Sequence, residues 1–187
     1  MTDTTTRLAE ILEAAEACWA RHAQVLEWER DARIRGPQDP FTAAMEFAHQ
    51  WRWLDYALAA ARADAEGGAA PPLLDDMDAQ NEAWAAEDAA LTFEDARDRC
   101  EAARSAYIAY VGERTAASPD EALLTAAYDN LVDHFDVHFA YIVAGSLAHE
   151  AAGWQRLTAI LDARPSEVLH RGDDGHAWRA ADIYAHL

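Results

Sequence analysis

Basic side chains and long apolar runs are both scarce in this sequence. Only 15 of its 187 residues are lysine or arginine, against 34 aspartates and glutamates, so the formal net charge is −19. Because binding to a phosphate backbone needs a cluster of basic residues, this composition excludes nucleic acid as a partner. No apolar run approaches the ~20 residues that a membrane-spanning helix needs. A soluble protein with no membrane partner is therefore predicted.

Cysteines and phosphate-binding loops are also rare or absent. The two cysteines, Cys18 and Cys100, are far apart, lie in helical patterns and form no CxxC pair, which favours two reduced, packed thiols. Neither a GxGxxG nor a Walker-type loop occurs, so no motif indicates nucleotide chemistry. The first residues, 1–7, lack the basic and apolar regions of a secretory signal, and a cytoplasmic location is expected.

Apolar residues at helical spacing are what the sequence has in abundance. Hydrophobic residues make up 51% of the chain, and no segment shows the alternation of a strand. Helix-start and helix-stop signals predict long helices from about Thr4 to Gly36, from Phe41 to Ala65, from Thr92 onward and from Pro119 onward, with a short helix at about Ala79–Ala89. Four long helices of this kind predict an all-α fold, most economically an antiparallel-type four-helix bundle.

The predicted helices divide the chain into two regions. Residues 5–145 hold the bundle, and residues 146–187 form a C-terminal helical extension that packs on the bundle or on a partner chain. The last long helix of the bundle has a marked start signal, with Ser118 as the expected N-cap and Pro119 as the first helical residue. The extension leaves a homodimer open.

His134 and His138 organise this last long helix. Four residues make just over one turn, so both imidazoles lie on one face, in a stripe that Ala127, Leu131 and Ile142 continue. Two buried neutral imidazoles leave polar nitrogens unsatisfied, whereas a divalent cation satisfies one nitrogen on each ring. Such a spacing also arises by chance in a chain with eight histidines, so a metal site needs a third ligand.

His49 is a single histidine on the strongly apolar second helix. By residue type alone it is either a core histidine or a metal ligand. Together with a Pro-rich break, a DxDAxN-like stretch (Asp76, Asp78, Ala79, Asn81) and the HxxxH helix, it resembles the pattern of the DinB-like superfamily of metalloenzymes. The similarity is greatest to the branch that holds the N-terminal domain of mycothiol-dependent maleylpyruvate isomerase and the ClbS/DfsB-type proteins.

This resemblance covers about residues 5–145. It implies a four-helix bundle in which His49, His134 and His138 bind a divalent ion, zinc or nickel, and leave positions open for water or for the thiolate of a low-molecular-weight thiol. Three neutral imidazoles plus water are also suited to Lewis-acid catalysis. The spacing of the histidines and the resemblance therefore favour the same site.

The start of the second helix departs from the pattern of this superfamily. Many members have Trp-Ser or Trp-Thr there, whereas this chain has Pro40-Phe41-Thr42. A Trp-initiated pattern occurs instead near the C-terminus, as Trp178-x-x-x-Asp182-x-x-x-His186. A rival register therefore stays open, in which His186 replaces His49, either within one chain or from a partner.

The resemblance implies an enzyme that acts on a small-molecule substrate. It would either transfer a small thiol to an electrophile or hydrolyse that electrophile. Asp136 and Tyr141 are the candidate catalytic residues because they lie along the helix of the histidine pair. Asp133 is a further candidate for orienting ligands or moving a proton. Asp133 and Asp136 equally fit the solvated side of an acidic helix.

Two other functions stay open at this point. A non-catalytic bundle would bind a metal or an apolar ligand among Trp51, Trp53 and Trp84, although aromatic residues at helical spacing usually belong to a core. A dimerisation module would exchange its C-terminal extension between two chains. Ligand binding measured beside turnover separates the first from an enzyme, and light scattering on a chain ending at Gly145 tests the second.

Overall fold

The computed structural model describes residues 4–30 and 41–147, and every element within them is helical, so the predicted all-α fold is confirmed for this part of the chain. The helices are α1 (Thr4–Trp28), α2 (Ala43–Ala65), α3 (Met77–Asp88), α4 (Phe93–Ala117), α5 (Glu121–Tyr128), the π-helical turn η1 (Asp129–Asp133) and α6 (His134–Leu147). No described helix is both long enough and apolar enough to cross a membrane.

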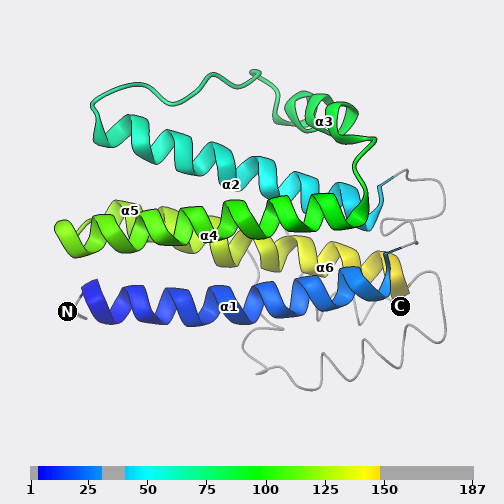
Figure 1. Ribbon diagram of the computed structural model, residues 1–187, viewed down its shortest axis with the longest axis horizontal. Coiled ribbons are helices and arrows are strands. Elements are labelled where there is room, and N and C mark those ends of the chain that lie inside the picture. The colour runs from blue at the N-terminus through cyan, green and yellow to red at the C-terminus, as the bar shows by residue number, and fades with distance from the viewer. Residues whose placement is uncertain (1–3, 31–40, 148–187) are drawn as a thin grey trace, which may run out of the picture.

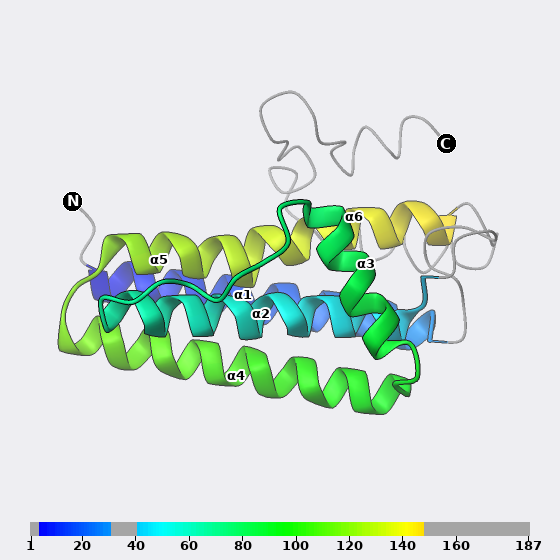
Figure 2. The ribbon, with the colours of Figure 1, turned by 90° about the horizontal axis from the view of Figure 1, so that it is seen from above.

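The long helices lie side by side along the longest axis of the molecule (Figure 1). α5, η1 and α6 form one continuous run, which packs against α1, while α2 packs against α4. The long helices are not all antiparallel to their neighbours, because α2 and α4 run in the same direction (Figures 1 and 2). Two neighbouring parallel helices need a long connection between them. The connection after α2 returns along the molecule and includes α3, which crosses over α2 (Figure 2).

Helix boundaries follow local capping chemistry. The Thr42 side chain accepts a hydrogen bond from the Met45 amide at the start of α2, and Thr92 caps α4 in the same way. The first helix is shorter than predicted, because α1 ends at Trp28 rather than near Gly36. Leu26 is its last buried residue, and none of the described residues after it, 27–30, is buried.

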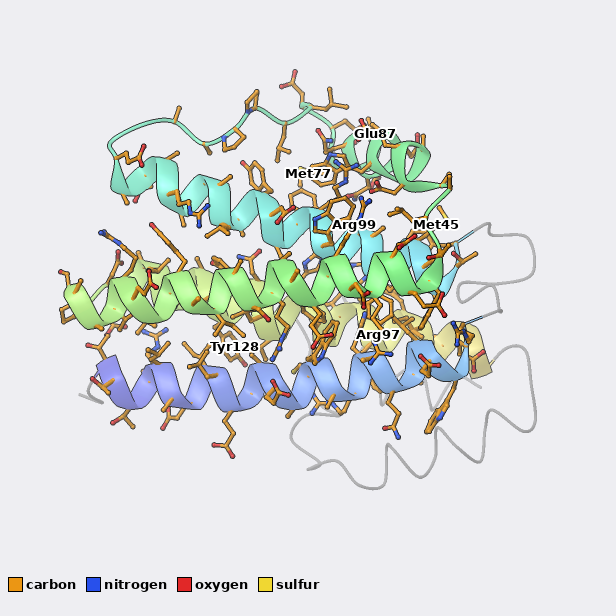
Figure 3. The ribbon with its side chains drawn as sticks, viewed as in Figure 1. Met45, Met77, Glu87, Arg97, Arg99 and Tyr128 are labelled. Carbon is orange, nitrogen blue, oxygen red and sulfur yellow. The ribbon has the colours of Figure 1, made fainter. Side chains whose placement is uncertain are left out.

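The core lies between the long helices, where their side chains interdigitate (Figure 3). Each long helix contributes a buried apolar stripe at helical spacing. The largest side chains with almost no exposure include Phe47, Leu54, Tyr107, Leu124, Phe135, Phe139 and Ile142. This packing fixes α2 and α6 relative to each other and therefore fixes whatever side chains project between them.

The N-cap of α5 differs from the sequence prediction. Ser118 ends α4, and the side chain of Asp120 accepts a hydrogen bond from the Leu123 amide at 2.9 Å. We expect Asp120→Ala to lower the free energy of unfolding by about 1 kcal/mol, because the amide loses its acceptor. Urea unfolding measures this, with Ser118→Ala as the control at under about 0.5 kcal/mol. Equal losses in the two variants would contradict Asp120 as the cap.

Nearly all of the predicted C-terminal extension, 146–187, lies outside the described residues. The same holds for His186 and for the rival register that it carries. The C-terminal extension and the rival register therefore stay predictions, as does the four-helix bundle.

Candidate metal centre

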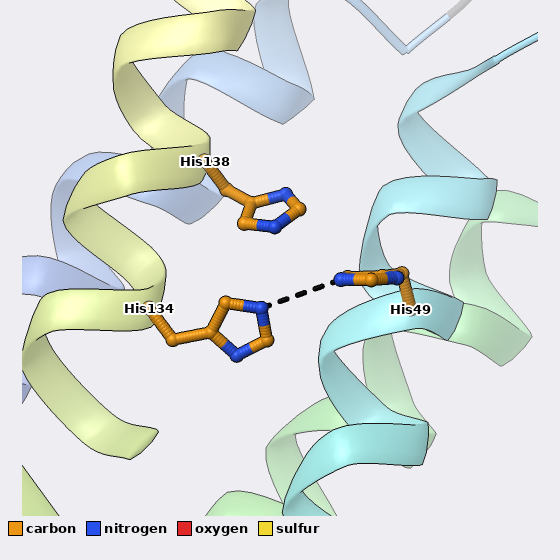
Figure 4. Close-up of side chains that lie close together, drawn as sticks. All are labelled: His49, His134 and His138. Atoms are coloured by element: carbon orange, nitrogen blue, oxygen red, sulfur yellow. Dashed lines mark hydrogen bonds between the residues drawn. The ribbon is translucent and has the colours of Figure 1, made fainter. Parts of the chain in front are cut away.

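The first two histidines of the site come from the start of α6. His134 and His138 lie one turn apart and project from the same side of the helix (Figure 4). Immediately before them the chain makes the π-helical turn η1, in which the His134 amide donates to the Asp129 carbonyl five residues back. Such turns shift the register of the following helix and are frequent at functional sites. Asp133, the last residue of the turn, is exposed.

His49 of α2 completes the cluster, although it is 85 residues from His134 in sequence. The Nε2 atoms of His49 and His134 lie 3.3 Å apart, and the His138 ring centroid is 4.6 Å from that of His49 and 4.7 Å from that of His134. One potential ligand atom from each of the three rings lies within 4.8 Å of the others (Figure 4). The structure thus brings together the three histidines that the resemblance implies.

Burial keeps His134 neutral. Burial is the largest cause that lowers the pKa of His134, and the neighbouring His138 and His49 lower it further, to about 3. A neutral imidazole has a free lone pair at one ring nitrogen, which is the form that binds a metal. His134 is therefore ready to act as a metal ligand at neutral pH.

Glu46 is a buried carboxylate next to these rings, and no sequence motif distinguishes it from the other acidic residues. It lies on α2 with 1% exposure, and its Oε1 atom is 2.9 Å from Nδ1 of His138. Burial opposes its ionisation, but the interactions with His138, then with His22 and His49, together hold the pKa of Glu46 well below its usual value. The site therefore contains one fixed negative charge behind the histidines.

A fourth histidine, His22 of α1, lies deeper in the core. It is completely buried, and its ring packs edge-on against Phe47 and Phe135. Within the described residues neither of its ring nitrogens has a hydrogen-bond partner, although Nε2 is 3.6 Å from Glu46 Oε1. Burial lowers the pKa of His22 to about 4, against the opposing effect of Glu46. His22 is thus neutral at physiological pH.

A small pocket of about 60 Å³ opens beside His49, between α2 and α3. Met45 of α2 and Trp84 of α3 contribute apolar walls, and Asn81 contributes an amide. Trp53 packs edge-on against Trp84, with ring centroids 5.0 Å apart, and donates from Nε1 to Asn81 Oδ1 at 3.1 Å. These contacts hold α3 over α2 and give the pocket its shape.

The two candidate catalytic residues lie on different sides of α6. Tyr141 is 51% exposed, and its ring centroid is 6.2 Å from that of His138. Asp136 is not part of the three-histidine group. Its Oδ1 atom accepts from Arg21 at 3.1 Å and from the Cys18 thiol at 3.4 Å, both on α1. Tyr141 is therefore beside the histidines, whereas Asp136 links α6 to α1.

The thiols and the third tryptophan have packing roles. Cys18 and Cys100 are both buried and free of disulfides, as the sequence predicts, and burial raises the pKa of the Cys100 thiol well above its usual value. The Trp51 ring lies under the guanidinium groups of Arg52 and Arg99, at 4.6 and 4.9 Å. Trp51 is thus involved in a different set of contacts from Trp53 and Trp84.

Comparisons with protein-family models, with curated proteins and with solved structures find no match for this chain. The geometry of the site therefore carries the functional argument.

Proposed function

We propose that this chain is a metal-dependent enzyme of the DinB-like superfamily, folded as a four-helix bundle, that transfers a small thiol to a small electrophilic substrate or hydrolyses that substrate. The observation that carries the proposal is the convergence of His49, His134 and His138 within 4.8 Å. These are the ligands that the resemblance implies. The side-by-side arrangement of α1, α2, α4 and the α5–α6 run supports the bundle.

The donor set fits a divalent ion. Without a metal, only one hydrogen fits between the Nε2 atoms of His49 and His134 at 3.3 Å, so these rings pair as donor and acceptor. With a metal, each ring instead offers a lone pair, and three neutral imidazoles suit zinc or nickel. An ion held by these residues would supply Lewis-acid chemistry, because it would lower the pKa of a bound water or thiol.

The residues around the histidines provide substrate binding and proton transfer. The pocket beside His49 combines the apolar walls of Met45 and Trp84 with the amide of Asn81, and its volume of about 60 Å³ suits one small group of a substrate rather than a whole molecule. Tyr141 is the candidate for moving a proton, because it is half exposed and adjacent to His138. Its phenol can therefore exchange protons with solvent.

A non-catalytic protein that binds a metal or a small molecule is the second candidate. The packing of Trp53 on Trp84 beside the pocket favours it, because a bound ligand would contact an indole ring. Tryptophan fluorescence recorded on adding candidate thiols and electrophiles, with turnover measured in parallel, separates the two functions. Saturable binding without turnover would favour the second.

Elemental analysis of the purified, tag-free protein tests the proposed metal centre. We expect about one equivalent of zinc or nickel per chain, and we expect His134→Ala and His49→Ala to abolish it, because each removes one of three ligands. Val137→Ala is the matched control. It lies on α6 next to His138, is 42% exposed, and should keep the metal.

Absence of metal even after reconstitution would overturn the proposal. Loss in His134→Ala but not in His49→Ala would instead assign the third position to His186, which His186→Ala then tests. The metal-loaded protein is next screened for thiol transfer and hydrolysis. Tyr141→Phe is expected to lower turnover by about 10²–10⁴-fold with the metal content unchanged.

A further inference from the structure

A carboxylate with 1% exposure is unusual on a helix face that is otherwise apolar, and Glu46 is such a group. It lies on the buried side of α2 with Ala43, Phe47 and Leu54, three residues before the candidate ligand His49. Acidic side chains are almost never fully buried unless they are paired. The partners of Glu46 therefore indicate why the carboxylate is there.

Three side chains from three helices surround the Glu46 carboxylate. His138 of α6 approaches with Nδ1 at 2.9 Å from Oε1 and 3.1 Å from Oε2. Gln50, one turn along α2, donates from Nε2 to Oε1 at 3.0 Å. His22 of α1 lies on the same side, with Nε2 3.6 Å from Oε1. Two imidazoles and one amide thus converge on the Glu46 carboxylate.

The contact with His138 fixes the state of that imidazole. A carboxylate accepts hydrogen bonds, so Nδ1 of His138 must carry the hydrogen. In its neutral form this ring then has its lone pair on Nε2, the nitrogen that Glu46 does not contact. Carboxylate–histidine pairs of this type fix the tautomer and orientation of metal ligands and raise their basicity.

We infer that Glu46 is a positioning residue of the proposed metal centre: it holds His138 with Nε2 available as a ligand and provides a buried negative charge that offsets the charge of a divalent ion. The inference rests on the proposed function. It extends that function to a residue outside the three-histidine group and explains why a costly buried charge lies behind that group.

A structural role and a positioning role make opposite predictions for the metal-free protein. If Glu46 mainly held helices together, Glu46→Gln would destabilise the chain. If its charge serves the metal, Glu46→Gln removes a charge that is costly to bury, while the amide oxygen of Gln can still accept a hydrogen bond from Nδ1 of His138. The metal-free variant should then be as stable as the wild type or more stable, while its affinity for zinc falls.

The experiment measures both quantities on the full chain. We expect Glu46→Gln to weaken zinc binding by about 10–100-fold in competition with a chromophoric chelator, with an unchanged or higher urea midpoint for the metal-free protein. Glu16→Gln is the matched control, because it makes the same chemical change at a side chain that is 70% exposed. It should leave zinc affinity unaltered.

A second variant keeps the test decisive if the amide perturbs folding. Glu46→Asp retains the charge and should bind zinc more tightly than Glu46→Gln; equal affinities would overturn the inference. A Glu46→Gln affinity within threefold of the wild type would overturn it too, as would a parallel loss of metal-free stability. If the wild type itself binds no zinc, the proposed function fails, whereas zinc binding that ignores Glu46 refutes only this inference.

Discussion

Acidification of the metal-free protein from pH 7 to pH 4.5 is expected to lower its free energy of unfolding by about 5 kcal/mol. The cause is the burial of two neutral histidines, His22 and His134, whose pKa values fall from 6.5 to about 4 and about 3. Between pH 6.5 and about 4, the unfolded chain binds protons at both residues and the folded chain does not. Stability is therefore complete above pH 6.5 and is lost as the pH falls.

The slope of this loss is the decisive quantity. Each of the two histidines contributes about 1.4 kcal/mol per pH unit within the window, which is a large share of the 5–15 kcal/mol typical for a domain. Urea unfolding in the presence of a chelator, at half-unit steps from pH 7 to pH 4.5, measures the slope. An unchanged midpoint over this range would contradict the neutral, buried state of these residues.

His22→Leu isolates one of the two contributions. Leucine has a similar volume to histidine and suits a fully buried site between Phe47 and Phe135, where neither ring nitrogen has a hydrogen-bond partner among the described residues. The variant should lose about half of the pH slope and should be more stable than the wild type at pH 5. A full slope in this variant would show that His22 is not one of the titrating groups.

The histidine pair could be predicted from local periodicity, whereas its partner could not. His134 and His138 are four residues apart on a helix, and that spacing alone places both rings on one face. His49 is 85 residues away from His134, and its position depends on how α2 packs against α6. Periodicity carries no information on that distance, so His49 was predicted from the resemblance.

The burial of Glu46 could not be predicted from the sequence. Acidic residues on helices are normally exposed, and the sequence has 34 of them, so a buried one has no distinguishing composition. The available signal is positional: Glu46 lies one turn before Gln50 on the face that buries Ala43 and Leu54. That signal becomes evident only when α6 places His138 against the carboxylate.

Addition of zinc is expected to raise the midpoint of thermal unfolding by about 8–16 °C at a free concentration 1,000 times the dissociation constant. A ligand that binds only the folded state stabilises it by RT ln(1 + [L]/Kd), which is about 4 kcal/mol at that ratio. In a chain of this size, 1 kcal/mol shifts the midpoint by about 2–4 °C. Differential scanning calorimetry at neutral pH, with and without zinc, measures the shift.

The variants locate the source of that stabilisation. His49→Ala leaves only the two ligands of α6, which lie one turn apart on one helix, so any residual zinc would contact α6 alone. The metal then no longer joins two helices, so the shift should fall below about 3 °C. His22→Leu should retain the full shift, because His22 is outside the ligand group. An equal shift in His49→Ala and the wild type would mean that zinc binds α6 alone, and the proposed centre between α2 and α6 would then be wrong.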